Sequence, residues 1–259
     1  MFIRTRNLAH PYYICNLKIL NFNIFQMINR RLVLFLLPFL LTLYSSFVSA
    51  QKRFSADSAH FSQPKNDRPY LKPSGLIVPG ALLFYGGLKP LVNPIAKLDD
   101  TIMAHVMARY PGFHTNAADY IMWVPAASIY ALDAFKVKTQ HSFKEHLIID
   151  AGSIVITGGI GFAMRKISQH IEVYNTHQTE FPSGHTANAF RGAEIVHQEL
   201  KFSHPVLSYS GYLVATGVGL LRIYNKDHLL SEVLAGAGLG ILSTKLTYWI
   251  FNKVKEKNR

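Results

Sequence analysis

Two short polar stretches of this sequence hold the residues that can do chemistry. The first, at residues 181–187, reads F-P-S-G-H-T-A, in which a proline and a glycine precede a helical pattern. The hydroxyl of Ser183, the backbone N–H of Gly184 and the imidazole of His185 would meet at such a corner, because the first N–H groups of a helix have no partner within it. A corner of this composition is suited to binding an anion.

The second stretch, at residues 222–232, reads R-I-Y-N-K-D-H-L-L-S-E. His228 and Glu232 are four residues apart and share one face if the stretch is helical. A carboxylate placed in this way fixes the tautomer of the imidazole and raises its basicity. Arg222 adds a permanent positive charge, so the stretch combines a basic histidine with a group that attracts anions.

Apolar segments flank both stretches and must position them. Hydrophobic residues make up 49% of the 259-residue chain and charged residues only 16%. The segments are close to the lower length limit for crossing a bilayer, about 17 to 25 residues. The small residues at 235–240, A-G-A-G-L-G, are typical of helix packing in lipid. We therefore expect an all-α integral membrane bundle of about five to six helices, built from segments near 75–92, 118–135, 147–164, 186–200, 206–221 and 233–251.

The N-terminal region predicts a signal peptide. Arg30 and Arg31 precede an uncharged run at 32–47, and V-S-A follows at 48–50. We expect cleavage after residue 50, with a true start near Met27; the alternative is an uncleaved anchor helix. The expected organisation is a signal peptide at 1–50, a polar leader at 51–73, a membrane domain at 74–252 and a basic cytoplasmic tail at 253–259.

The lysines predict how the bundle is oriented. Lys136, Lys138 and Lys144 share one connector, and the tail is also basic, as in loops on the cytoplasmic side of a membrane. Both polar stretches then lie on the opposite, periplasmic face, provided that segment 75–92 does not cross. Its prolines and glycines favour an interfacial or re-entrant segment. We expect a multi-pass protein of the bacterial inner membrane with its site facing the periplasm.

Composition also disfavours several classes of protein. The net charge is +12, but residues 1–50 contribute five basic residues and no acid, so we expect no nucleic-acid partner. The single cysteine, Cys15, excludes a disulfide framework and metal sites built from cysteine. No two histidines occupy matched positions in the middle of the apolar segments, which disfavours a transporter or a haem-binding bundle.

The two polar stretches resemble the type 2 phosphatidic acid phosphatase superfamily, whose members share a core with vanadium haloperoxidases. The family pattern is K-x6-R-P, then P-S-G-H, then S-R-x5-H-x3-D. Residues 182–185 match the second motif. Arg222, His228 and Glu232 match the third, with Leu221 in place of its Ser and Glu in place of its Asp. The resemblance covers about residues 98–251 and implies the core fold of that superfamily.

The resemblance also implies roles for individual residues. His228 would be the nucleophile, oriented by Glu232, and His185 would protonate the leaving alkoxide. The phosphate oxygens would be bound by Arg222, the Ser183 hydroxyl, the Gly184 N–H and Arg165. The family mechanism implies neither a metal nor another cofactor.

The first motif departs from the family pattern. Counting back from Ser183 places Arg165 at the family's lysine, Glu172 at its arginine and Val173 at its proline. An acid then stands where a phosphate-binding cation is expected, and the two charges repel unless Glu172 turns away or pairs with a neighbouring cation.

Two functional hypotheses follow from the match of this sequence to the three motifs. The first is a lipid phosphatase that hydrolyses a phosphate monoester or an isoprenoid diphosphate reached from the bilayer. The second is an impaired member of the family that binds lipid phosphate or a partner protein without turnover. The altered first motif is the feature that favours the second hypothesis.

Overall fold

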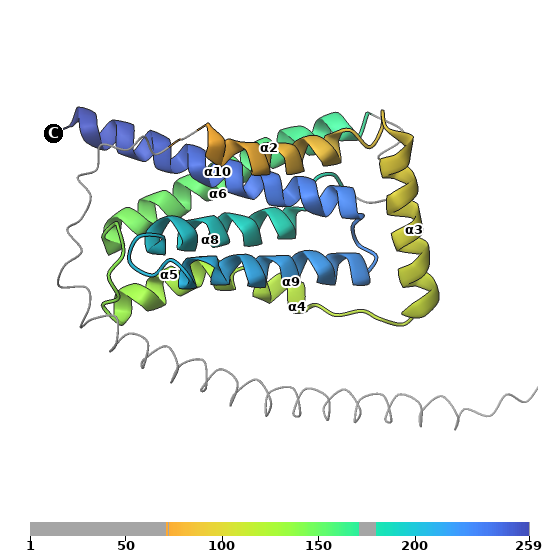
Figure 1. Ribbon diagram of the computed structural model, residues 1–259, viewed down its shortest axis with the longest axis horizontal. Helices are drawn as coiled ribbons and strands as arrows, with labels where there is room; N and C mark the ends of the chain where they lie inside the picture. Colours follow the sequence, from red (N-terminus) through yellow and green to blue (C-terminus); the bar gives the residue numbers. More distant parts are fainter. Residues whose placement is uncertain (1–70, 72, 171–179, 259) are drawn as a thin grey trace, which may run out of the picture. The chain divides into compact units, whose positions relative to one another are not determined.

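The computed structural model describes residues 71, 73–170 and 180–258, and every regular element in these ranges is a helix. The chain divides into two units, residues 1–67 and 68–259, and all described residues belong to the second. The signal peptide and leader expected at 1–73 lie, except for residues 71 and 73, outside the described residues. The helices are α2 (Ser74–Gly87), α3 (Asn93–Arg109), α4 (Ala117–Ile121), α5 (Val124–Ala134), α6 (Phe143–Ser168), α8 (Gly184–Leu200), η2 (Leu207–Tyr209), α9 (Ser210–Tyr224) and α10 (Leu230–Lys257) (Figure 1).

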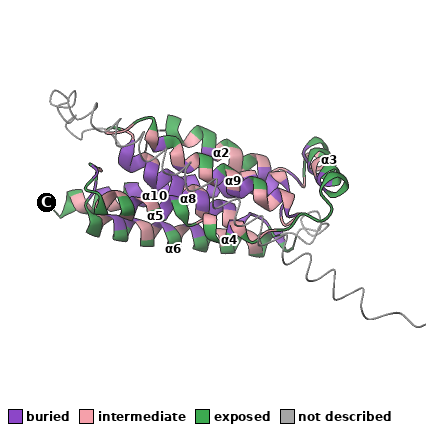
Figure 2. Cartoon of the chain, turned by 90° about the horizontal axis from the view of Figure 1, so that it is seen from below, coloured by how far each residue is buried: buried purple, intermediate pink, exposed green. Residues whose placement is uncertain are grey.

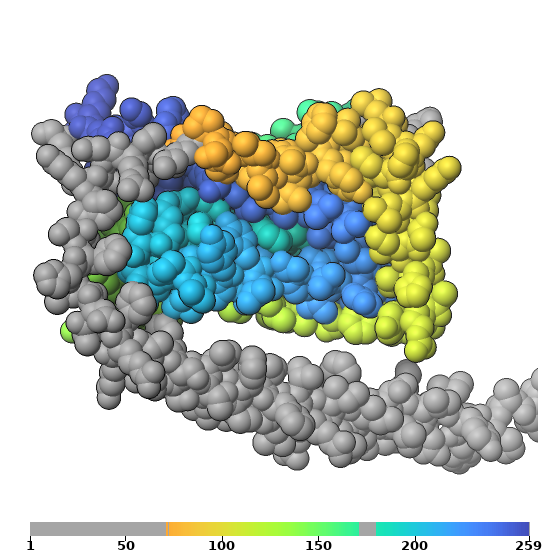
Figure 3. Space-filling model, viewed as in Figure 1, coloured from red at the N-terminus to blue at the C-terminus, as the bar shows by residue number. Residues whose placement is uncertain are grey.

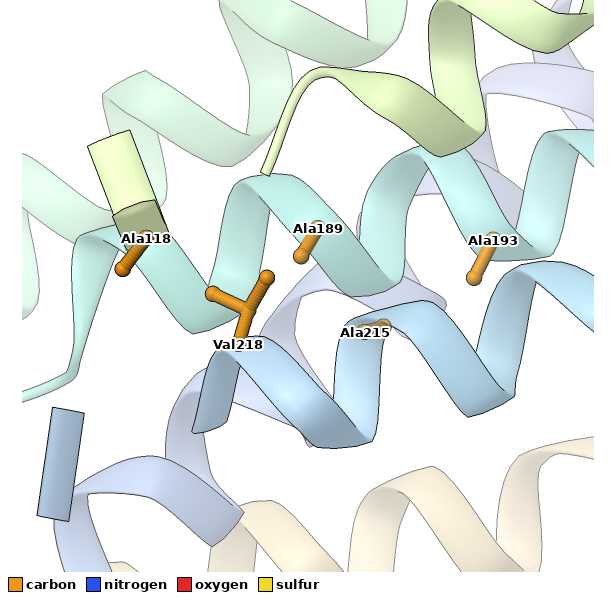
Figure 4. Packing of buried hydrophobic residues seen from close by; sticks show 5 residues of the cluster. All are labelled: Ala118, Ala189, Ala193, Ala215 and Val218. Atoms are coloured by element: carbon orange, nitrogen blue, oxygen red, sulfur yellow. The ribbon is translucent and has the colours of Figure 1, made fainter. Parts of the chain in front are cut away.

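Helix α8 is the centre of the bundle, with α5, α6, α9 and α10 packed around it. Twelve of its 17 residues are buried, and its ribbon is mostly purple in Figure 2. Ala189 and Ala193 of α8 pack against Ala215 and Val218 of α9 and against Ala118 of α4 (Figure 4). Side chains this small allow the helix backbones to approach closely.

The predicted packing of small residues at 235–240 is confirmed. A Cβ atom added to Gly236 would lie 2.5 Å from the carbonyl oxygen of Ser183, and one added to Gly238 would lie 2.5 Å from the carbonyl oxygen of Pro79. Helix α10 therefore contacts α8 on one side and α2 on the other through positions without a side chain.

The distribution of polarity is that of a protein whose surface faces lipid. Helices α6 and α10 are long and apolar enough to cross a membrane, and only 17% of the apolar window of α6 is buried. Val155 and Phe162 of α6 are 72% and 64% exposed. Inside the bundle, Arg191 pairs with Asp150, while Glu194 accepts a hydrogen bond from Lys245 at 2.7 Å. Apolar side chains outside and paired charges inside are typical of membrane helices.

The expected all-α bundle is confirmed, and the structure adds two features to the six apolar segments. Segment 118–135 divides at Trp123 into the short α4 and α5, whose second residue is Pro125. Helix α3 was not expected, because Lys97, Asp99 and Asp100 lower the hydropathy of its sequence. It crosses the end of the bundle, where Val106 packs against Ile223 and Val233 (Figures 1 and 3).

Segment 75–92 does not lie flat across an end of the bundle, as an interfacial helix would. Its residues up to Gly87 belong to α2, which runs lengthwise along α10: a Cβ atom on Gly75 would lie 3.9 Å from the Lys245 Nζ, and one on Gly86 would clash with the carbonyl oxygen of Ser231. The 14 residues of α2 extend about 21 Å, which is less than the roughly 30 Å of a hydrocarbon core.

The two polar stretches lie at one end of the bundle, and the basic connector and tail at the other. Lys255 of α10 pairs with Glu145 at the start of α6. At the opposite end, the Ser183 N–H donates to the carbonyl oxygen of Glu232 at 3.1 Å. The orientation predicted from the lysines requires this separation, with the basic connector and tail at one end and the polar stretches at the other. The basic tail is part of α10, which continues to Lys257.

Candidate active site

His228 and Glu232 form a buried pair at the start of α10. The His228 Nδ1 lies 3.0 Å from the Glu232 Oε2, and the two residues are 6% and 0% exposed. The Leu229 N–H donates to the same carboxylate oxygen at 3.1 Å. Because His228 precedes the helix by two residues, the pair forms when Glu232 reaches back to the helix start and not through a shared helical face.

This pairing defines the chemistry of the imidazole. A carboxylate at Nδ1 keeps the proton on that nitrogen, and the lone pair is left on Nε2. A histidine in this state is a nucleophile at Nε2.

The 181–187 corner lies directly beside this pair. Ser183 is the N-cap residue of α8, and its N–H donates to the Glu232 carbonyl. The Ser183 hydroxyl is buried and lies 2.9 Å from the Thr186 Oγ1, so its hydrogen bond in this structure is internal. Gly184 and His185 open the helix, where backbone N–H groups lack partners within the helix.

His185 has a carboxylate partner that sequence reasoning missed. Its Nε2 lies 2.8 Å from the Asp119 Oδ1. Burial and the positive charge of Arg222 lower the pKa of the His185 ring, which lies outside the two candidate membrane spans, and Asp119 opposes that shift. Asp119 belongs to α4, inside a segment that looked uniformly apolar, and no motif marks it.

Two arginines reach the corner from different helices. The Arg222 Nη1, at the end of α9, lies 3.1 Å from the Asp227 Oδ2 and 3.9 Å from the Asp119 Oδ1. The Arg165 Nη1, near the end of α6, lies 2.8 Å from the Glu180 Oε2. The Arg165 Nη2 also lies 3.6 Å from the point where a Cβ atom on Gly184 would be.

Both guanidinium groups retain donors for a further ligand. Within the described part of the chain, the Nε atoms of Arg165 and Arg222 are buried and have no hydrogen-bond partner. Buried polar groups are usually paired, and a guanidinium group with an unused donor can form charge-assisted hydrogen bonds with an anion.

The loop after α9 holds α4 in place. The Asn225 side chain exchanges two hydrogen bonds with the backbone of Thr115, at 3.0 and 2.7 Å. The Lys226 Nζ donates to the carbonyl oxygens of Pro111 and Phe113, at 3.2 and 3.1 Å. These contacts fix the segment that leads to Asp119.

The altered first motif is placed only in part. Arg165 lies at the site, whereas Glu172 and Val173 lie outside the described residues. Among the residues that are described, no group of three or more His, Cys, Asp or Glu side chains is arranged to hold a metal ion.

The structure thus brings together all seven residues expected at the site. Two histidines, each with a carboxylate partner, lie beside two arginines and the start of a helix. Such an arrangement can transfer a phosphoryl group, because it supplies a nucleophile, a proton donor and positive charge for the phosphate oxygens.

Comparisons with known proteins agree with this chemistry. Residues 161–256 match the family model of the PAP2 superfamily. The lipid A 1-phosphatase of Porphyromonas gingivalis is 34% identical over 155 residues, which are 60% of this chain and 35% of that protein. The chain therefore spans about a third of the length of this relative.

A solved structure is also similar. It is the first transmembrane PAP2 type phosphatidylglycerolphosphate phosphatase from Bacillus subtilis, with 20% identity and a TM-score of 0.43. The similarity covers 68% of this chain and 97% of that chain. The match to the PAP2 superfamily covers residues 161–256 and includes all seven site residues, so this part of the chain is similar to that family.

Proposed function

We propose that this protein hydrolyses a phosphate monoester or diphosphate on a membrane lipid, without a metal ion and through a phosphohistidine intermediate. The pairing of the His228 Nδ1 with Glu232 carries the proposal, because it leaves the Nε2 lone pair free to attack phosphorus. The similarity to a lipid A 1-phosphatase supports the same class of substrate.

The first step transfers the phosphoryl group to the enzyme. The His228 Nε2 attacks phosphorus, and the bond from phosphorus to the lipid oxygen breaks while His185 gives that oxygen a proton. The guanidinium groups of Arg165 and Arg222 and the Gly184 N–H bind the non-bridging oxygens, whose charge rises in the transition state. The Ser183 hydroxyl reaches these oxygens if it exchanges its bond to Thr186 for one to the phosphate.

The second step returns the enzyme to its starting state. Water attacks phosphorus, the bond from phosphorus to Nε2 breaks, and the now neutral His185 accepts the proton of the water. The products are inorganic phosphate and a lipid alcohol, or a lipid monophosphate if the substrate was a diphosphate. Asp119 orients the His185 ring and raises its basicity in both steps.

The substrate class follows from the place of the site. The site lies at one end of a bundle whose outer surface is apolar, so the reacting phosphate group would be held at the membrane surface while its lipid chains remain in the bilayer. Candidate substrates are phosphatidic acid, phosphatidylglycerol phosphate, undecaprenyl diphosphate and phosphorylated lipid A. The basic connector and tail at the opposite end favour an inner-membrane protein with its site toward the periplasm.

Phosphate release by the purified protein tests this proposal. The protein in detergent, with chelator present, would be assayed against these four lipids beside His228→Ala. A matched control is His105→Ala, because His105 is an exposed histidine on α3. We expect one or more lipids to release phosphate with the wild type and the control, and release to fall at least about 10²-fold with His228→Ala. Release that needs added metal, or that survives in His228→Ala, would contradict the proposal.

A second candidate function rests on the first motif. Glu172 stands where the family pattern has an arginine, so the alternative is a protein that binds lipid phosphate or a partner without turnover. Titration with orthovanadate, an analogue of phosphate in its transition state, separates the two. Binding of vanadate without release of phosphate from any lipid would favour the second function.

A further inference from the structure

Asp99 is a buried carboxylate outside all three family motifs. It lies on α3, the helix that crosses the end of the bundle, and is 1% exposed. Its Oδ1 accepts a hydrogen bond from the Ser231 N–H at 3.0 Å, and its Oδ2 accepts one from the Ser231 hydroxyl. Two hydrogen bonds thus join residues that are 132 positions apart in the chain.

Ser231 is the second residue of α10, immediately before Glu232. N–H groups in the first turn of a helix have no partner within the helix, so α10 needs acceptors from elsewhere. Glu232 accepts from the Leu229 N–H, and Asp99 accepts from the Ser231 N–H. Two carboxylates, one from each of two helices, therefore cap the start of α10.

Electrostatic interactions also hold Asp99 beside the start of α10. Lys89, which is 3% exposed, attracts Asp99, whereas Glu232 repels it. The positive end of the α10 dipole and the Lys89 ammonium offset the repulsion between the two carboxylates. The three charges therefore favour one position of Asp99 beside the first turn of α10.

The position of that turn decides the geometry of the catalytic pair. Glu232 binds the His228 Nδ1 with its side chain and the Ser183 N–H with its carbonyl oxygen. A displacement of about 1 Å at a reacting group can cost about 10²-fold in rate. A residue that holds Ser231 therefore influences where the lone pair of His228 points.

We propose that Asp99 is a positioning residue for the phosphatase reaction: from α3 it fixes the first turn of α10 and, through Ser231, the Glu232–His228 pair. The proposal rests on the proposed function, and it makes α3 part of the active site although none of its residues needs to touch the substrate.

Substitution of Asp99 and its neighbours tests this role. Asp99→Ala removes both acceptors, Asp99→Asn keeps one oxygen, and Ser231→Ala removes only the hydroxyl donor. The exposed neighbour Asp100 gives the matched control, Asp100→Ala. We expect kcat to fall about tenfold or more in Asp99→Ala and less in the other two, while KM stays within about twofold and the control keeps wild-type kcat.

A double-mutant cycle separates positioning from a general loss of structure. If Asp99 acts through Glu232, Asp99→Asn should have little further effect on kcat in a Glu232→Gln background. If kcat of the double mutant fell by the product of the Asp99→Asn and Glu232→Gln effects, the proposal would be overturned. Wild-type kcat in Asp99→Ala would also overturn it. The Asp99→Asn and Ser231→Ala proteins keep the test open if Asp99→Ala fails to fold.

A readout without turnover distinguishes this proposal from the proposed function. In protein labelled with ¹⁵N-histidine, the resonances absent from His228→Ala identify the His228 ring, and their shifts report which nitrogen carries the proton. We expect a proton on Nδ1 in the wild type and a mixture of tautomers in Asp99→Ala. An unchanged tautomer in Asp99→Ala would overturn the positioning role, whether or not the wild type releases phosphate.

Discussion

The backbone N–H of Ser183 donates a hydrogen bond to the carbonyl oxygen of Glu232, with a nitrogen-to-oxygen distance of 3.1 Å. Ser183 is the N-cap residue of α8, and Glu232 lies in the first turn of α10, so one hydrogen bond joins the two polar stretches through residues that are 49 positions apart in the sequence. The corner that we propose binds phosphate and the proposed nucleophile are thereby joined directly. Close packing of α8 on α10 is the condition for this bond.

We predict that Gly236→Ala lowers the activity of a protein that still folds. The new Cβ would lie 2.5 Å from the Ser183 carbonyl oxygen, too close unless α10 moves away from α8 at the site. Overpacking of this kind costs about 1 to 3 kcal/mol in free energy of unfolding. We expect kcat to fall at least about tenfold, measured by phosphate release beside thermal unfolding in detergent.

The control for this substitution is Gly217→Ala in α9, where a Cβ atom would have no neighbour within 4 Å. It makes the same chemical change in a helix of the same bundle. Wild-type kcat in Gly236→Ala would show that the contact between α8 and α10 does not set the geometry of the site.

The pair formed by His185 and Asp119 predicts a change in the pH profile. Asp119 raises the pKa of His185, and burial and Arg222 lower it. Since the proposed mechanism needs protonated His185, we expect kcat/KM to fall as pH rises through this pKa. Asp119→Asn removes the group that raises it, so we expect the alkaline limb of the kcat/KM profile to move to lower pH.

The Asp227→Asn protein provides a comparison, because Asp227 contacts Arg222 but has no hydrogen bond to His185. A limb that stays in place in Asp119→Asn, or moves to higher pH, would mean that the acid in the reaction is a group other than His185.

The altered first motif predicts a gain from a single substitution. If Glu172 faces the phosphate, it repels a dianion, so Glu172→Arg should leave kcat/KM unchanged or raise it. Glu172→Gln, which removes the charge without adding a cation, separates loss of repulsion from gain of attraction. Loss of turnover in a folded Glu172→Arg protein would show that residue 172 is not the counterpart of the family's arginine.

The sequence predicts the local part of this site well and the remote part poorly. His228, Glu232 and residues 183–185 are marked by spacing within two short stretches, and the structure brings these stretches together. Asp119 and Asp99 reach the site only through packing of distant helices, so no local pattern identifies them.

The helices, like the site residues, divide into those that the sequence predicts and those that it does not. Long apolar runs such as α6 and α10 are evident in the sequence, because burial in lipid selects apolar residues along their whole length. Helix α3 was missed because a helix across the end of a bundle needs only one apolar stripe, here Ile95, Met103 and Val106. The pairing of Glu232 with His228 was predicted, but as a contact on one helical face; that Glu232 instead reaches back from the first turn of α10 depends on where this helix begins.

The central claim is that His228 carries the phosphoryl group during turnover. The most direct measurement is to mix the protein with a ³²P-labelled lipid phosphate that it hydrolyses, stop the reaction within milliseconds in alkali, and map the label by mass spectrometry. A phosphoramidate at histidine survives alkali and is lost in acid. We predict an alkali-stable, acid-labile label on His228 that is absent from His228→Ala. Phosphate release from a wild-type protein that never becomes labelled, or a label on a different residue, would contradict the mechanism.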